Sequence, residues 1–206
     1  MLKFLVLIWS MLIVGGCGNT ADESQAGKET AAENGILEDV LVGEVPPELG
    51  IYENEDCAHW VGDTPCNMVL KDQNDEYWEL YEHKGKPIVI DLSVMWCGPC
   101  KRAADESEAI YADYQSYDLE YVTVLVEDVS GSEPDLDDIL IWVEDHGVQE
   151  TTVLQGLQDV VDYAGIEGYP CGAWPTFVFI NREMQIHWGM HGWNEDTVRS
   201  YIEEIL

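Results

Sequence analysis

The sequence predicts an α/β domain that is built on a central β-sheet and covers about residues 49–206. Strongly apolar segments of strand length alternate with Ala- and Glu-rich segments of helix length, and the alternation ends with two adjacent strands and a helix. Apolar residues make up 46% of the chain, which is too much for a disordered protein and enough for a packed core. Such an alternation favours a sheet with helices packed against it.

The first half of this domain predicts a hairpin, a buried strand, a helix and a second buried strand. The turn-rich tetrad Asp72–Asp75 separates the two strands of the hairpin, and the helical segment after Cys100 contains neither Gly nor Pro. The two buried strands are largely apolar runs, as in strands that are covered on both faces. In chain order, the expected elements cover residues 67–70, 77–80, 87–92, 100–117 and 120–127.

The second half predicts a helix, a short strand, a short helix, two adjacent strands and a final helix. Ser132 is the expected N-cap of the first of these helices and Asn194 that of the last. The apolar faces of these two helices consist of Leu136, Ile139, Leu140 and Val143, and of Val198, Tyr201, Ile202 and Ile205. The elements between them cover residues 151–154, 158–163, 175–181 and 184–188.

Residues 1–16 have the order of a secretory signal peptide: a positive charge at Lys3, an apolar run, and small residues before Cys17. The run is too short to span a bilayer, which takes about 20 apolar residues. This order resembles the bacterial lipobox, whose cysteine becomes the lipidated N-terminus; the alternative is an ordinary signal peptide followed by a chance cysteine. Residues 17–48 are then an acidic, flexible tether. The lipid on Cys17 anchors the domain to a bilayer.

The charge and the cysteine content limit the partners and the compartment. The chain has 9 Lys and Arg against 41 Asp and Glu, a net charge of −32, which argues against nucleic acid as a partner because phosphate backbones need a basic surface. Anionic lipid head groups are disfavoured for the same reason. Six cysteines are few for a disulfide scaffold but many for a cytosolic protein.

The segment 96–101, Trp-Cys-Gly-Pro-Cys-Lys, carries the chemistry. It lies where a buried strand gives way to a helix, so Cys97 is expected at the helix N-terminus, where unpaired N–H groups and the helix dipole favour a thiolate. Cys100 lies within the first turn, close enough to form a disulfide with Cys97, and Gly98 and Pro99 shape the tight ring. This spacing indicates a redox-active pair.

Half of a zinc site is the alternative interpretation of these two cysteines. Zinc needs four ligands, and the sequence contains no second C-x-x-C. The other ligand-like pair is His187 and His191, whose neighbouring glycines are typical of a strand end and a turn. We therefore expect no metal.

These features resemble the thioredoxin superfamily. Residues 96–101 match the thioredoxin active-site string, Asp91 matches its buried acid, and residues 174–176, Trp-Pro-Thr, match its cis-proline loop. The resemblance implies a thioredoxin-like fold with a central mixed β-sheet flanked by helices. An N-terminal hairpin, the lead-in at residues 85–87 and an extra helix inserted between residues 127 and 151 are similar to the membrane-tethered TlpA/ResA-like branch.

The resemblance implies a role for each of these residues. Cys97 is expected to attack a substrate disulfide, Cys100 to resolve the mixed disulfide, and Asp91 to accept the proton of Cys100, with Glu127 as a weaker candidate for a second acid. No cofactor is implied, because the disulfide carries the electrons. The surface that an extended substrate contacts consists of Trp96, Gly98, Pro99, Trp174 and Pro175.

Several positions depart from the thioredoxin pattern. The helix after Cys100 lacks the proline that kinks it in many thioredoxins, and Trp174 replaces the usual small or β-branched residue before the cis-proline. Pro170 is the second candidate for the cis-proline itself. Val94 stands where peroxiredoxins have a Thr, so their pattern does not match.

The three remaining cysteines of the domain are expected to play structural roles. Cys57 and Cys66 are close in sequence and predict a local disulfide in an oxidising compartment. Cys171 is then the odd cysteine, and burial is favoured over exchange with the active site, because free Cys is among the most buried residue types. Pairing of Cys171 with Cys57 or with Cys66 stays open.

The expected function is that of a lipid-anchored bacterial thiol–disulfide oxidoreductase of the cell envelope, facing the periplasm or the cell exterior. The Gly-Pro dipeptide between the cysteines resembles reducing members of the superfamily, which favours a reductase that acts on protein substrates and takes electrons from a membrane donor. Two alternatives stay open: a structural or binding module whose C-x-x-C is a permanent disulfide, and a metal-delivery protein.

Overall fold

The computed structural model describes residues 47–53 and 55–206. The predicted signal peptide, Cys17 and all but the last two residues of the predicted tether lie outside the described residues. Within the described part, no helix is long and apolar enough to cross a membrane.

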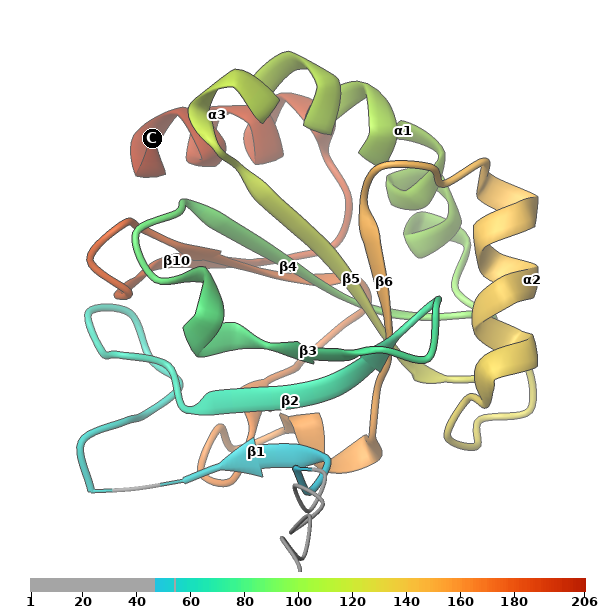
Figure 1. Ribbon diagram of the computed structural model, residues 1–206, viewed down its shortest axis with the longest axis horizontal. Coiled ribbons are helices and arrows are strands. Elements are labelled where there is room, and N and C mark those ends of the chain that lie inside the picture. The colour runs from blue at the N-terminus through green and yellow to red at the C-terminus, as the bar shows by residue number, and fades with distance from the viewer. Residues whose placement is uncertain (1–46, 54) are drawn as a thin grey trace, which may run out of the picture. The chain divides into compact units, whose positions relative to one another are not determined.

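The domain is an eight-stranded mixed sheet with helices packed on it (Figure 1), so the predicted α/β, thioredoxin-like class is confirmed. The strand order is β1-β2-β6-β5-β4-β9-β10, and β3 pairs with β2. These strands are β1 (Gly50–Tyr52), β2 (Asn67–Asp72), β3 (Tyr77–Glu79), β4 (Ile88–Val94), β5 (Glu120–Glu127), β6 (Thr152–Gln155), β9 (Thr176–Ile180) and β10 (Ile186–His191). The α-helices are α1 (Gly98–Tyr114), α2 (Leu136–His146) and α3 (Glu195–Ile205).

The buried strand β4 organises the sheet. All seven of its residues are buried, as its apolar sequence predicts. It pairs in parallel with β5 on one side and antiparallel with β9 on the other, and Leu92 lies opposite Thr176. Because β9 enters the sheet antiparallel, the segment just before it meets the end of β4, which positions the site described below.

Two apolar clusters cover opposite faces of the sheet. Val89 of β4 belongs to a cluster with residues from α1 and α3, including Ile110 and Ile202. The alternate residues Ile88 and Ile90 belong to the other cluster, which includes residues of α2. This period-2 alternation follows from the pleat, which points successive side chains to opposite faces.

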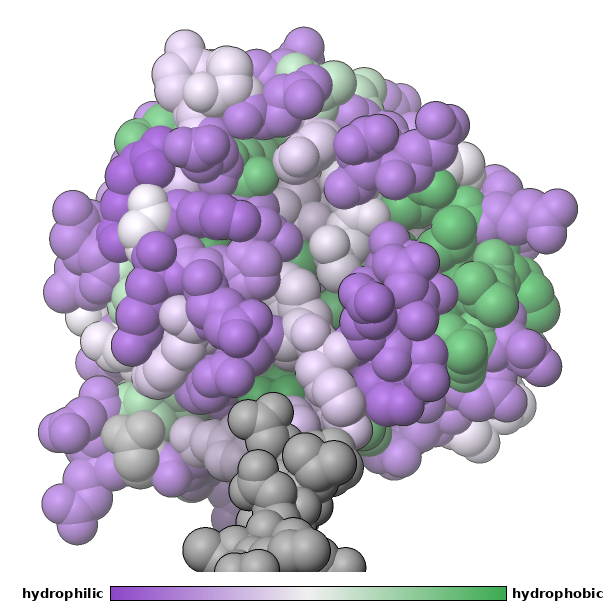
Figure 2. Space-filling view, in the orientation of Figure 1, coloured by the Kyte–Doolittle hydropathy of each residue, from purple (hydrophilic) through white to green (hydrophobic). Residues whose placement is uncertain are grey.

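The helix α2 begins and packs differently from the prediction. Its N-cap is Asp135, not Ser132, because Asp135 and Asp138 form a capping box. The Asp135 side chain accepts a hydrogen bond from the backbone N–H of Asp138, and the Asp138 side chain accepts one from the backbone N–H of Asp135. Its fully buried residues are Ile139 and Trp142, whereas Leu140 is 45% exposed. The buried face is thus a narrow i, i+3 stripe, and Figure 2 shows the apolar surface that results over α2.

A short helix over residues 158–163 is also not what the chain forms. A 3₁₀ turn (Gln158–Val160) is followed at once by the two-residue strand β7 (Val161–Asp162), which pairs in parallel with β8 (Tyr169–Pro170). The Asp162 carboxylate accepts hydrogen bonds from the backbone N–H groups of Ala164 and Ile166. These bonds turn the chain away from a helical path. The remaining 3₁₀ segments are Leu80–His83 and Gln115–Tyr117.

Candidate active site

Cys97 and Cys100 form a disulfide at the point where β4 leads into α1, with their Cα atoms 5.3 Å apart. Cys97 is the N-cap of α1, and its sulfur accepts a hydrogen bond from the backbone N–H of Cys100 at 3.1 Å. Cys97 is 5% exposed and Cys100 is fully buried. The less buried of the two cysteines is therefore the one at the helix N-terminus, where the N–H groups stabilise negative charge.

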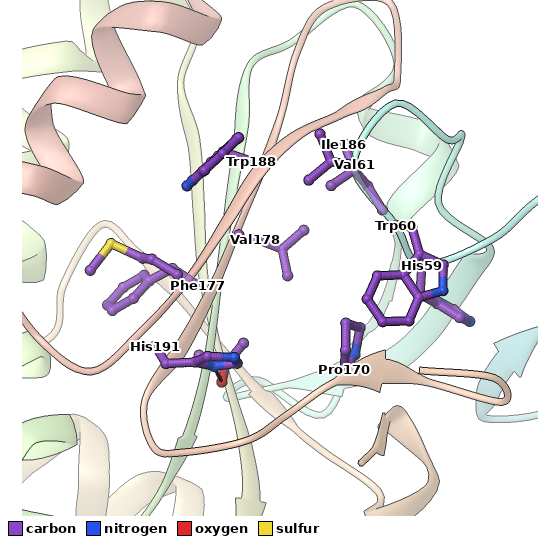
Figure 3. A pocket seen from close by; sticks show the side chains of 12 residues that line it. His59, Trp60, Val61, Pro170, Phe177, Val178, Ile186, Trp188 and His191 are labelled. Carbon is purple, nitrogen blue, oxygen red and sulfur yellow. Dashed lines mark hydrogen bonds between the residues drawn. The ribbon is translucent and has the colours of Figure 1, made fainter. Parts of the chain in front are cut away.

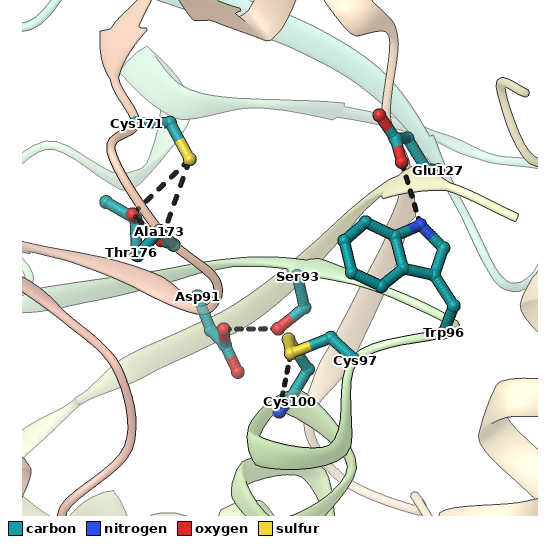
Figure 4. The surroundings of a disulfide bond; sticks show 9 residues. All are labelled: Asp91, Ser93, Trp96, Cys97, Cys100, Glu127, Cys171, Ala173 and Thr176. Carbon is teal, nitrogen blue, oxygen red and sulfur yellow. Dashed lines mark hydrogen bonds between the residues drawn. A yellow bond between two sulfur atoms is a disulfide. The ribbon is translucent and has the colours of Figure 1, made fainter. Parts of the chain in front are cut away.

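Asp91 and Ser93 lie next to each other on one face of β4, close to the disulfide (Figure 4). Both side chains are fully buried, and the Ser93 hydroxyl donates a hydrogen bond to Oδ1 of Asp91 at 2.7 Å. Oδ2 of Asp91 and the hydroxyl of Tyr121 are buried without a hydrogen-bond partner. Burial raises the pKa of Asp91 to about 7, and the bond from Ser93 opposes that shift. A carboxyl group with such a pKa can accept and release a proton at neutral pH.

Trp96 and Glu127 form a contact that the sequence reasoning missed. Trp96 directly precedes Cys97 and is 52% exposed. Its indole N–H donates a hydrogen bond to the Glu127 carboxylate at 2.8 Å (Figure 4). The signal was present, since both residues lie at or just beyond the carboxyl ends of neighbouring parallel strands, which meet at one edge of the sheet. Glu127 thus orients an aromatic wall of the site.

The loop before β9 brings Trp174 and Pro175 to the same edge. The peptide bond between them is cis, and no other bond in the described part of the chain is; Pro170, the second candidate, lies in β8. The carbonyl of Pro175 accepts a hydrogen bond from the backbone N–H of Gly192 at 2.7 Å, which ties the loop to the end of β10. Trp174 is partly buried and packs against the apolar cluster that contains both active-site cysteines.

Cys171 carries a free thiol and is half-buried rather than fully buried. The hydroxyl of Thr176 donates a hydrogen bond to its sulfur at 3.5 Å (Figure 4). Burial raises the pKa of the Cys171 thiol, so the neutral thiol is the favoured form at neutral pH.

Cys57 and Cys66 form a second disulfide, with an S–S distance of 2.04 Å. It closes a loop that is fixed to the beginning of β10 by two backbone hydrogen bonds. The N–H of Gly62 donates to the carbonyl of Ile186 at 2.7 Å, and the N–H of Ile186 donates to the carbonyl of Asp63 at 2.9 Å. The loop is therefore a firm part of the domain surface next to β10.

The described residues contain no cluster of three or more side chains that could hold a metal ion. His187 and His191 each have another partner: His187 lies 2.9 Å from the Glu204 carboxylate, and His191 lies 2.8 Å from the Thr176 hydroxyl.

Comparison with known proteins agrees with this geometry. Residues 61–188 match the AhpC/TSA family. The chain is 28% identical, over 147 residues that cover 70% of it and 76% of the relative, to the thiol-disulfide oxidoreductase ResA of Halalkalibacterium halodurans. Its fold is similar to that of a DsbF homologue from Corynebacterium diphtheriae (TM-score 0.56, 15% identity, 75% of this chain and 91% of the other). It is also similar to an exposed lipoprotein thioredoxin of Streptococcus pneumoniae (TM-score 0.55, 19% identity, 67% and 98%).

Proposed function

The chain belongs to the AhpC/TSA family, and we propose that it is a thiol–disulfide oxidoreductase that reduces protein disulfides in the bacterial cell envelope. One observation carries the proposal: the Cys97–Cys100 pair lies at a helix N-terminus, with the buried Asp91 and the cis-proline loop beside it. The similarity to a thiol-disulfide oxidoreductase over most of the chain supports the same chemistry.

The first step is attack by the reduced Cys97. The N–H groups at the start of α1 stabilise its thiolate, and one of them already contacts the sulfur. The thiolate attacks one sulfur of the substrate disulfide, so an S–S bond between Cys97 and the substrate forms while the S–S bond of the substrate breaks. The leaving sulfur departs as a thiolate and takes a proton from water.

The second step is resolution by Cys100. Its thiol gives its proton to Asp91, the buried acid of the site, and the resulting thiolate attacks Cys97. The bond between Cys97 and the substrate breaks, and the second substrate sulfur leaves as a thiolate that takes a proton from water. Two electrons have then passed from the cysteine pair to the substrate, and the chain carries the Cys97–Cys100 disulfide that the structure shows. The substrate-facing surface in both steps is formed by Trp96, Gly98, Pro99, Trp174 and Pro175.

The direction and the location are further parts of the proposal. Gly98 and Pro99, between the cysteines, favour the reducing direction, by resemblance to reducing thioredoxins. A reductase in an oxidising compartment needs an electron donor, and a membrane protein that crosses the bilayer is the class of partner that supplies one. The signal-like residues 1–16 and Cys17 support a lipid anchor, and one structural neighbour is itself described as an exposed lipoprotein.

A permanent structural disulfide, which is one of the two alternatives from the sequence, and peroxide reduction both have less support. A permanent structural disulfide does not need a buried acid with a raised pKa beside it, whereas Asp91 is such an acid. Peroxide reduction in the manner of peroxiredoxins lacks the Thr before the cysteine, where this chain has Val94.

A pair of cysteine variants tests the proposal. Cys100→Ser should accumulate mixed disulfides with envelope proteins, because Cys97 still attacks and nothing resolves the product, whereas Cys97→Ser should accumulate none. Alkylation of the wild-type chain in cells should show mostly reduced Cys97 and Cys100. Equal trapping by the two variants would refute the assigned roles, and a fully oxidised pair in cells would refute the reducing direction.

A further inference from the structure

A cavity of about 210 Å³ lies between the disulfide-closed loop 57–66 and the β9–β10 hairpin (Figure 3). His59, Trp60 and Val61 form one wall, and Val178, Ile186 and Gly189 line the other. A dry protein cavity of about 150 Å³ can hold a benzene molecule. This one therefore has room for one aromatic or branched aliphatic side chain.

The apolar rim of this cavity is open to solvent. Trp60 is 53% exposed and Val61 is 55% exposed. Two large, half-exposed apolar side chains beside one hollow favour a binding surface, because such surface is costly to leave in water. The loop that carries both of them is held by the Cys57–Cys66 disulfide and by its backbone bonds to Ile186, so the wall is preformed.

The cavity ends beside the loop that faces the cysteine pair. Thr176, which lines it, directly follows the cis-proline Pro175. His191, also in the lining, lies 2.8 Å from the Thr176 hydroxyl, and the next residue, Gly192, bonds to the carbonyl of Pro175. A polypeptide that lies extended along Pro175 can therefore continue into the cavity without leaving the surface.

The charge around the cavity selects the kind of segment that enters. No Lys, Arg, Asp or Glu lines it, so its charge is set by the residues around it. Burial lowers the pKa of His59, which keeps its ring neutral, while the nearby carboxylates of Glu53, Asp162 and Asp63 oppose that shift. The surroundings are thus negative, as is the whole chain. Basic polypeptide segments are electrostatically favoured here.

Resting on the proposed function, we infer that this cavity binds a large apolar side chain from a basic segment of the substrate polypeptide, near the cysteine that forms the mixed disulfide with Cys97. The cavity then determines which disulfides the chain reduces, and the cysteine pair performs the chemistry on all of them.

Peptide pairs test this inference. Each pair shares one disulfide and Lys-containing flanks, and one member has Trp where the other has Ala, within a few residues of the cysteine. We compare the pair whose Trp position gives the highest kcat/KM. The reduced chain should reduce this Trp peptide with a kcat/KM about tenfold higher than that of its Ala partner, as burial of one such side chain predicts. Replacing the Lys flanks by Glu should lower kcat/KM several-fold, and added salt should shrink this difference.

Variants of the cavity wall test whether the preference for the Trp peptide comes from this cavity. Trp60→Ala and Val61→Asp should each bring the Trp-to-Ala ratio close to one, whereas Tyr163→Ala should keep the wild-type ratio, since Tyr163 is 86% exposed and is not in the cavity lining. If Trp60→Ala fails to fold, the exposed Val61 still carries the test. A ratio of one in the wild type, or a wild-type ratio in a folded cavity variant, overturns the inference. Failure to reduce any peptide refutes the proposed function instead.

Discussion

Ser93 donates a hydrogen bond to Asp91 across 2.7 Å, and both side chains are fully buried in the strand that leads to the active-site cysteines. The residues are two positions apart, so the pleat of β4 places them on the same face. The bond stabilises the ionised carboxylate, which burial disfavours. Ser93 therefore sets the pH range in which Asp91 can accept the proton of Cys100.

We expect Ser93→Ala to move the resolution step to higher pH. Loss of a hydrogen bond to the carboxylate raises the pKa of Asp91 further, by roughly one to two pH units for a bond to a charged group. The rate of mixed-disulfide resolution, followed by stopped flow across pH, should show this shift. Ser93→Thr keeps the hydroxyl and should restore the wild-type profile; an unchanged profile in Ser93→Ala would exclude this role for Ser93.

Asp91→Asn should make the domain more stable at pH 8. In the folded chain burial raises the pKa of Asp91 to about 7, above the usual carboxyl range, so the folded state holds a proton that the unfolded state has lost. The stability cost is absent below about pH 4, grows as the pH rises, and is complete above about pH 7. Three pH units correspond to on the order of 4 kcal/mol.

Denaturant unfolding of the oxidised protein at a series of pH values measures this cost. The wild type should lose stability between about pH 4 and pH 7 relative to Asp91→Asn, which lacks the titrating group. Asp137→Asn on the exposed side of α2 is the matched control and should keep the wild-type slope. Parallel stability curves for the wild type and Asp91→Asn would show that Asp91 ionises without cost.

Much of this site follows from local sequence patterns, and the rest depends on contacts between distant segments. The long apolar runs predicted β4 and β5, and the C-x-x-C motif predicted the start of α1. The sequence predicts the wrong N-cap for α2, because Ser132 and Asp135 are both good N-cap types and only the contact with the Asp138 side chain distinguishes them. The N-cap of α2 therefore depends on a side-chain contact that the sequence pattern alone does not show.

The cavity shows more clearly what local sequence patterns cannot predict. Its walls come from Trp60 and Ile186, which are far apart in the chain and meet because the backbone of the loop bonds to that of Ile186. No periodicity links such segments. The Ser93–Asp91 bond, in contrast, was accessible from the sequence, since polar residues two apart in a buried strand share a face.

Glu108→Gln should weaken the link between α1 and the segment before β6. Burial alone would raise the pKa of Glu108, but hydrogen bonds from the Thr151, Gln149 and Glu150 backbone N–H groups and from the Thr151 hydroxyl lower it. A lowered pKa means that the stabilisation is present above the unfolded value, near pH 4.5, and is lost as the pH falls through the folded value. We expect a loss of about 1 kcal/mol at neutral pH.

Unfolding at pH 7 and in mild acid checks this difference. The wild type should approach the variant as the pH falls below about 4, because the protonated carboxyl accepts these bonds poorly. Glu106→Gln, on an exposed position of the same helix, should match the wild type at every pH. A pH-independent gap between Glu108→Gln and the wild type would assign the effect to packing instead of charge.

Cys17→Ser should release the domain from the membrane. The proposed lipid anchor would depend on that one sulfur, because the apolar run before it is too short to span a bilayer. Labelling with a radioactive fatty acid and fractionation of membranes measure the effect. Cys57→Ser is a control that should keep the label, and label on Cys17→Ser would exclude the anchor.

Reduction of the cysteine pair should raise tryptophan fluorescence, and Trp96 and Trp174 should carry most of the change. Trp96 directly precedes Cys97, and Trp174 packs against the cluster that contains both sulfurs. A disulfide close to an indole quenches its emission, so opening the bond relieves the quenching. The five other tryptophans of the described residues, Trp60, Trp78, Trp142, Trp188 and Trp193, give a background that should barely respond. Replacement of both Trp96 and Trp174 by Phe should remove most of the redox-linked signal.

Each single variant should retain part of the redox-linked signal, and the control variant Trp142→Phe should retain all of it. A full signal in the double variant would show that neither indole senses the active-site disulfide, and Trp174 would then lose its place on the substrate-facing surface.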